Sequence, residues 1–291
     1  MVNIVNFYYN DSPLAFYKTF DLKFDVTSNK SFTERISAGE PDICRNLKDI
    51  FQIHVYPDDC LSVDKIITNK CTDKKDFFPF IIRTSTEKCA WMQEFRRINN
   101  LHFVIAINYD RDYLWIIDPM TTLEIQKIPL DLIDDFVLAL YAVRLESRKG
   151  PSAEELFLQS LTHIKQLSLS NQFEHFIQAV LQCPDISDEY TDIHKSYWSS
   201  KLEVNIGYRI AGSRGLYAKF LFLIAETLGI SRLYEISVEL NDLMNQWVAL
   251  KNIFYKSFVI RNYEKYKRKI VNQILNIQNK EESILYKLLS I

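Results

Sequence analysis

Two side chains that together could carry out acid–base chemistry, His102 and Asp118, lie in the stretch NNLHFVIAINYDRDYLWIIDP, residues 99–119. His102 begins one apolar run, and Asp118 ends the next. A carboxylate beside an imidazole accepts the ring N–H, fixes the tautomer and stabilises the imidazolium once it forms. The pair is therefore a candidate for a general base, His102, and the residue that orients it, Asp118.

The length of the loop between the two runs decides whether these side chains meet. Side chains alternate between the two faces of a strand. A three-residue loop at 109–111 places His102 directly opposite Asp118, whereas a two-residue loop places Phe103 there and sends the polar groups to opposite faces. The alternative interpretation is structural: a half-buried histidine at a sheet edge and an aspartate that starts an Asp-Pro turn.

The elements that must position this pair belong to a mixed region. Short β-branched and aromatic runs predict strands at 20–26, 77–84, 101–108 and 113–119, and DICRNLKDIF predicts a helix at 42–51. Strands interspersed with helices over this length are typical of an α+β domain.

The composition changes at ESRKGPSAEE, residues 146–155, where Gly150 and Pro151 interrupt the chain and Ser152 can cap a helix. Beyond this point apolar residues recur at three- and four-residue spacing, which predicts helices. The predicted helices span 152–167, 171–182, 213–229, 230–258 and 262–278. We therefore expect an α+β domain over residues 1–148 and an all-helical domain over residues 149–291.

Composition excludes several classes of protein. With 35 Lys and Arg against 37 Asp and Glu, no global charge favours nucleic acid. The apolar runs, such as FVLALYAV, are far shorter than the roughly 20 residues of a membrane span. Five cysteines without a CxxC pair argue against a disulfide framework and a zinc site. We expect a cytoplasmic protein with reduced thiols and no cofactor or metal of its own; homo-oligomerisation stays open.

The stretch FFPFIIRTSTEKCAWMQEFRRINNLHFVIAINYDRDYLWIIDP resembles the butirosin biosynthesis protein H N-terminal family, which has a papain-like fold of the peptidase C39 type. The later stretch SRGLYAKFLFLIAETLG resembles the helical domain that follows in that family. The resemblance implies transfer of an acyl group from the phosphopantetheine thioester of an acyl or peptidyl carrier protein to a small amine. It assigns His102 as the general base and Asp118 as its orienter.

The family's nucleophile is a cysteine near the N-terminus, but no cysteine precedes Cys44 here. Ser12 can stand in that place, with Asn6 as an amide donor to an oxyanion. Alternatively, Ser12 and Pro13 form the N-cap and first residue of a helix. Because a hydroxyl is a far weaker acid than a thiol, the capping role is favoured.

The remaining candidates have structural interpretations. Cys44 lies in an amphipathic helix and is expected to pack there, and Cys89, beside Trp91, could line a channel before the His102 strand. The other four histidines have no partner at metal-ligand spacing and are assigned to helix surfaces: His54, His163, His175 and His194.

The run RNYEKYKRK contains Arg261, Lys265, Lys267, Arg268 and Lys269. It is interpreted as a solvated helix face, with contact to an acidic carrier protein as the alternative. Taken with the resemblance, the sequence predicts an acyl-transferring or amide-forming protein of natural-product biosynthesis, of the non-ribosomal peptide or aminoglycoside type. The alternatives are a catalytically inactive binding protein with the same fold and, less favoured, a peptidase.

Overall fold

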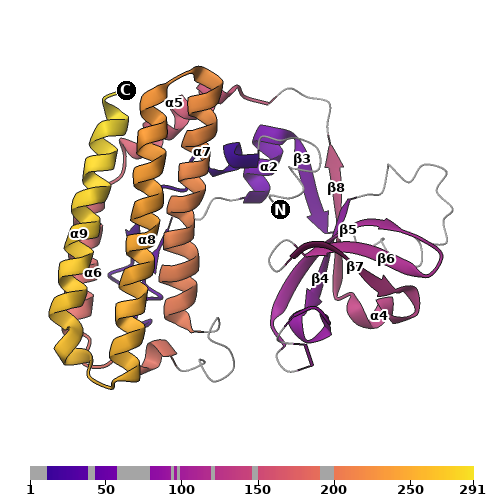
Figure 1. Ribbon diagram of the computed structural model, residues 1–291, viewed down its shortest axis with the longest axis horizontal. Helices are drawn as coiled ribbons and strands as arrows, with labels where there is room; N and C mark the ends of the chain where they lie inside the picture. Colours follow the sequence, from indigo (N-terminus) through magenta and orange to yellow (C-terminus); the bar gives the residue numbers. More distant parts are fainter. Residues whose placement is uncertain are drawn as a thin grey trace. The chain divides into compact units, whose positions relative to one another are not determined.

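The computed structural model describes residues 12–38, 43–57, 79–92, 95–96, 99–118, 122–145, 150–190 and 200–291. The chain divides into two units. One comprises Met1–Ser12 and Ile43–Gly150, and the other comprises Pro13–Asp42 and Pro151–Ile291. The chain is thus α+β, with a six-stranded antiparallel sheet and a helical C-terminal region (Figure 1).

The first unit is built on the six-stranded sheet. Its strands are β3 (Ile53–Pro57), β4 (Phe80–Ser85), β5 (Leu101–Tyr109), β6 (Tyr113–Asp118), β7 (Thr122–Pro129) and β8 (Ala139–Leu145). They lie in the order β3-β8-β4-β5-β6-β7, and every neighbouring pair is antiparallel. The helical elements are α2 (Ile43–Phe51), η3 (Thr86–Lys88), η4 (Leu130–Leu132) and α4 (Ile133–Phe136).

The core of this unit lies on one face of the sheet, because alternate residues of each strand point to it. On β5 these are Val104 and Ala106, and on β6 they are Leu114 and Ile116, all with no exposed surface. His102 and Asp118 continue the same alternation by two residues on each strand. The polar pair therefore sits at the edge of an apolar core.

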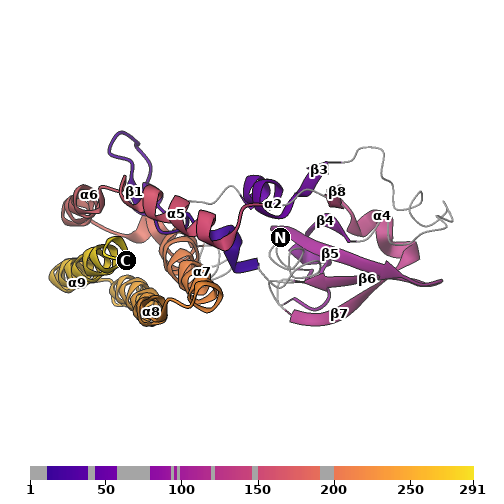
Figure 2. The same cartoon turned by 90° about the horizontal axis from the view of Figure 1, so that it is seen from above.

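The second unit is mainly helical. It contains β1 (Lys23–Phe24), β2 (Ile36–Ser37), α5 (Ala153–Ile164), α6 (Leu169–Gln182), η5 (Ser187–Tyr190), the π-helix η7 (Glu203–Ala211), α7 (Gly212–Leu228), α8 (Ser231–Val259) and α9 (Tyr263–Leu289). The long helices run side by side in both views (Figures 1 and 2). All five helices predicted from spacing are present. Ser152 caps α5 as predicted: its hydroxyl accepts from the Glu155 N–H, and Glu155 accepts in return from the Ser152 N–H.

The N-terminal segment corrects the expected domain boundary. Residues 13–42 belong to the helical unit, not to the sheet unit, because their aromatic side chains pack among the helices. The Phe24 ring lies 6.1 Å from that of Phe176, and the Phe32 ring lies 5.4 Å from that of Phe254. The predicted strand at 20–26 shrinks to the two residues of β1, which pair with β2 outside the main sheet.

Across the described residues, no helix is both long enough and apolar enough to span a membrane.

Candidate functional site

His102 and Asp118 form a buried hydrogen-bonded pair. His102 is the second residue of β5 and is 3% exposed; Asp118 is the last residue of β6 and has no exposed surface. The His102 Nε2 lies 2.9 Å from the Asp118 Oδ2. This distance confirms the prediction that the two side chains come within hydrogen-bond reach.

The predicted register of the hairpin is wrong, although the faces are right. Ile105 pairs with Ile117, and continuing this register by one residue places Asp118 opposite Val104 rather than opposite His102. The offset is two residues. An even offset keeps both side chains on the same face, and diagonal neighbours remain within reach of long side chains.

The two-residue difference between the predicted and the observed register has two causes. Tyr109 pairs with Leu114, so four residues rather than three lie between the last paired positions, and a β-bulge interrupts the pairing between Ala106 and Asn108. The Asp110 carboxylate organises the turn, since its Oδ1 accepts the backbone N–H of Asp112 at 2.9 Å and that of Tyr113 at 2.8 Å.

A third residue, Trp91, also belongs to the site. Its indole Nε1 donates to Asp118 Oδ2 at 2.6 Å, the same oxygen that faces His102. Trp91 lies on the connection between β4 and β5, which is closed by the Thr86 N–H to Asn100 oxygen bond at 2.9 Å. Sequence reasoning placed Trp91 beside a channel and missed this bond. Nothing in the spacing of the residues signals it, because Trp91 lies outside any periodic element.

The arrangement leaves one ring nitrogen of His102 for chemistry. Nε2 is engaged by Asp118, and no hydrogen bond joins Nδ1 to any residue that the structure describes. An imidazole oriented by a carboxylate through one nitrogen can accept a proton at the other. The pair therefore has the geometry of an oriented general base.

No nucleophile contacts this base within the described part of the chain. Ser12 is buried and begins the short 3-10 helix η1 (Ser12–Phe16), and no hydrogen bond joins it to His102. Asn6 lies outside the described residues. Cys44 is the second residue of α2, but its side chain also lies outside the description.

Cys89 is a structural residue. Its side chain has no exposed surface, belongs to the core cluster of the sheet unit and donates to the Ser85 carbonyl oxygen at 3.4 Å. Burial, together with the negative charge of Asp118, raises the pKa of the Cys89 thiol to about 12. A thiol held in its neutral form is a poor nucleophile.

The assignment of all other histidines to helix surfaces needs correction. His54 lies in strand β3, where it pairs with Arg144 of β8. His175 is exposed on α6, as expected, whereas His163 of α5 is half-buried and its pKa is lowered, chiefly by burial. His194 lies outside the described residues. Among the described residues, no cluster of His, Cys, Asp and Glu is arranged to hold a metal ion.

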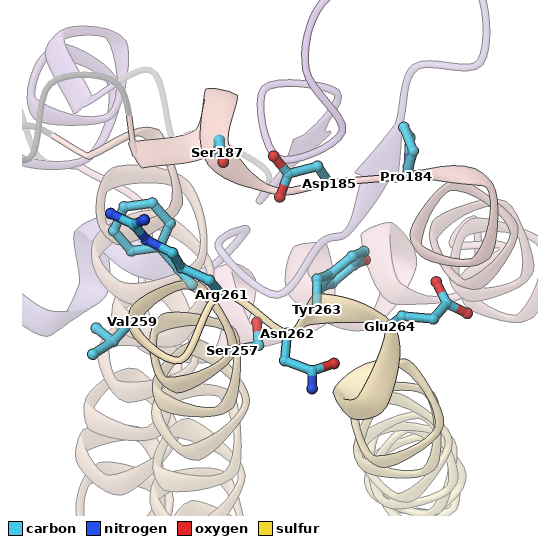
Figure 3. A pocket seen from close by; sticks show the side chains of 10 residues that line it. Pro184, Asp185, Ser187, Ser257, Val259, Arg261, Asn262, Tyr263 and Glu264 are labelled. Carbon is cyan, nitrogen blue, oxygen red and sulfur yellow. The ribbon is translucent and has the colours of Figure 1, made fainter.

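A cavity of about 780 Å³ lies in the helical unit, between residues 184–187 and the α8–α9 turn at 257–264 (Figure 3). All the residues that line this cavity belong to the helical unit, whereas the dyad belongs to the sheet unit. The basic run begins here with Arg261. Lys267 of this run is engaged in packing: its Nζ contacts Glu264 at 2.8 Å and donates to the Leu181 carbonyl oxygen at 3.1 Å. The other four cations are exposed, so their contact with a carrier protein stays a prediction.

No protein-family model matches the chain, and no curated protein matches it either.

Proposed function

We propose that the protein transfers an acyl group to an amine in natural-product biosynthesis, of the non-ribosomal peptide or aminoglycoside type. The acyl donor is the phosphopantetheine thioester of an acyl or peptidyl carrier protein. The observation that carries the proposal is the 2.9 Å contact between His102 and Asp118 on adjacent antiparallel strands. A papain-like fold, suggested by the resemblance described above, is part of the same proposal.

The reaction needs no covalent intermediate on the protein. The amine nitrogen attacks the thioester carbonyl carbon, and the proton it loses passes to His102 Nδ1. The C–S bond then breaks, and the imidazolium returns the proton to the departing phosphopantetheine thiolate. Asp118 stabilises the imidazolium between the two transfers.

The direct test is the rate of amide formation from acylated carrier protein and a panel of amines. A general base contributes about 10²–10⁴-fold to a rate, and His102→Ala is expected to lose that factor. His175→Ala, which removes an exposed imidazole from α6, is the matched control and is expected to retain the full rate. An unchanged rate in His102→Ala would remove the proposed base.

A second candidate is a binding protein of the same kind of pathway, which recognises a carrier protein or partner enzyme and catalyses no reaction. The inert Cys89 thiol favours it, because the described thiol nearest in sequence to the dyad is buried in its neutral form. Carrier-protein binding without product from any amine would support this candidate. A peptidase is the least favoured, since an amide needs more activation than a thioester.

A further inference from the structure

The hydrogen bond from Trp91 to Asp118 bears on how the dyad is held. An indole N–H can only donate, so Asp118 Oδ2 must act as an acceptor towards Trp91 at 2.6 Å. The His102 Nε2 approaches the same oxygen at 2.9 Å. An ionised carboxylate oxygen can accept from both nitrogens at once, which places the imidazole proton on Nε2 and the lone pair on Nδ1.

The alternative state of the pair is a neutral one. Asp118 has no exposed surface, and burial without compensation disfavours a carboxylate. This neutral state holds one proton more than the ionised one: a proton taken up from solvent resides on the carboxyl group, and the neutral imidazole carries its own proton on Nδ1, where it cannot act as a base. Each hydrogen bond donated to the charged form opposes this outcome.

We propose that Trp91 is a positioning residue, which keeps Asp118 an ionised acceptor and thereby fixes the Nε2–H tautomer of His102. The proposal deepens the proposed function and takes its catalytic meaning from it, but the tautomer exists without any substrate. Trp91 is itself fixed by packing, since its ring lies 6.2 Å from that of Phe136 in α4.

The hairpin offers a matched control. Trp115 of β6 also donates its indole N–H to an aspartate, with 2.9 Å between Nε1 and Asp110 Oδ2, but at the turn end of the strand. Trp91→Phe and Trp115→Phe therefore remove the same group, an indole N–H, from aspartates at opposite ends of β6: Asp118 at its end and Asp110 in the turn before it. Only Trp91→Phe is expected to change the tautomer of His102.

The test measures the ring-nitrogen NMR shifts of ¹⁵N-labelled histidine, with His102→Ala used for assignment, at a pH where the imidazole is neutral. In Trp91→Phe the ratio of the Nε2–H to the Nδ1–H tautomer is expected to fall about tenfold, because hydrogen bonds to charged groups are the strong ones. In Trp115→Phe the ratio is expected to stay as in the native protein.

An unchanged ratio in folded Trp91→Phe overturns the proposal. If that variant does not fold, 3-benzothienylalanine at position 91 preserves the ring shape and replaces only the N–H, and the same two outcomes decide. The inference and the proposed function fail separately. If the native protein forms no amide but Trp91→Phe shows the tautomer shift, the proposed function is refuted and the role of Trp91 stands. If the native protein forms the amide but Trp91→Phe shows no shift, the proposed function stands and the role of Trp91 is refuted.

Discussion

At the scale of single residues, Cys89 allows a direct prediction of reactivity. Burial first, and the charge of Asp118 second, raise its thiol pKa from 9.0 to about 12. Because only the thiolate reacts, Cys89 in the folded protein is expected to alkylate roughly a thousandfold more slowly than in the unfolded chain near neutral pH. Iodoacetamide labelling with and without urea, followed by mass spectrometry of the Cys89 peptide, measures both rates. Rapid labelling of Cys89 in the native protein would contradict its place in the core.

The raised pKa of the buried Glu189 carboxyl group predicts that the stability of the protein depends on pH. Glu189 is 2% exposed, and its carboxyl group accepts from the backbone N–H and hydroxyl of Thr33. Burial raises its pKa from 4.5 to about 7 against the opposing effects of the Thr33 backbone N–H, the Ser31 hydroxyl and Lys201. Nearby Glu34 contributes to the rise. The folded state thus holds a proton that the unfolded state releases between these two values. Stability from this group is full below pH 4.5 and is lost as the pH rises through about 7.

Glu189→Gln should remove that loss. The variant is expected to gain stability relative to the native protein on going from pH 5 to pH 8, by on the order of 2 kcal/mol. Urea denaturation at the two pH values measures the difference, and Glu174→Gln, which alters an exposed residue of α6, serves as the control. Equal pH dependence in Glu189→Gln and the native protein would refute the assignment.

The residues of the dyad show which features of the site can be predicted from the alternation of side chains along a strand. Period-two alternation places His102 and Asp118 on one face for any even offset, so their proximity is predictable without the correct register. The bulge and the four-residue turn are not predictable from alternation, since they depend on the Asp110 carboxylate and its neighbours. The Trp91 bond is less predictable still, because it is a tertiary contact from an irregular connection.

At the scale of elements, the helices were predictable because a 3.6-residue period repeated over 12 to 29 residues leaves little ambiguity. The strands β3, β7 and β8 were not predicted. Strand β7 reads TLEIQKIP, which includes three residue types depleted in strands, Glu124, Lys127 and Pro129, and it is held by its pairing with β6. The π-helix η7, which packs against α8, was not predicted from the apolar spacing either.

The π-helix supports a prediction about Gly207. A Cβ at this position would lie 2.7 Å from Glu203 Oε1 and 2.9 Å from Lys251 Cδ, whereas a Cβ at Gly212 would meet nothing within 4 Å. Both substitutions to alanine improve helix propensity by about 1 kcal/mol. Gly212→Ala is therefore expected to stabilise the protein. Gly207→Ala must displace the Glu203–Lys251 ion pair, 2.9 Å apart, and overpacking of this kind costs about 1–3 kcal/mol.

The difference between the two variants is the measured quantity, read as the free energy of unfolding in urea. Gly207→Ala should fall below Gly212→Ala, with a loss of ion pairing as the cause. Equal stabilisation of both would show that Lys251 and Glu203 adjust freely, and that Gly207 is not required for their contact.

At the scale of the whole molecule, the division at Gly150 was predictable but its reason was not. The sequence marks Gly150 as a breaker, whereas in the fold a Cβ there would lie 1.8 Å from the Ile50 carbonyl oxygen. The path of residues 13–42 was not predictable either. Their aromatic spacing fits a strand, and only the packing of Phe24 and Phe32 among the helices decides against the main sheet.

A buried ionic network ties this segment to the helices. Arg214 of α7 donates from Nε and Nη2 to the two carboxylate oxygens of Glu281 in α9, at 2.9 and 2.8 Å, and Trp247 of α8 donates to the same carboxylate at 2.9 Å. Arg214 Nη1 also donates to the Asp21 carbonyl oxygen at 2.6 Å. Neither Arg214 nor Glu281 has exposed surface, so each is compensated only inside the protein.

Removing one partner should therefore weaken both the bundle and the attachment of the N-terminal segment. Glu281→Ala leaves a buried guanidinium unpaired and is expected to cost about 3–5 kcal/mol. Lys280→Ala, at the neighbouring residue of α9, breaks the more exposed pair with Asp242 of α8 and should cost about 1 kcal/mol or less. Urea denaturation measures the stabilities, and hydrogen exchange of the amides at 19–24 reports the attachment. Because Arg214 also holds the Asp21 carbonyl, exchange there should accelerate in Glu281→Ala and not in Lys280→Ala. Equal costs in the two variants, or unchanged exchange at 19–24, would show that the network does not hold the segment in place.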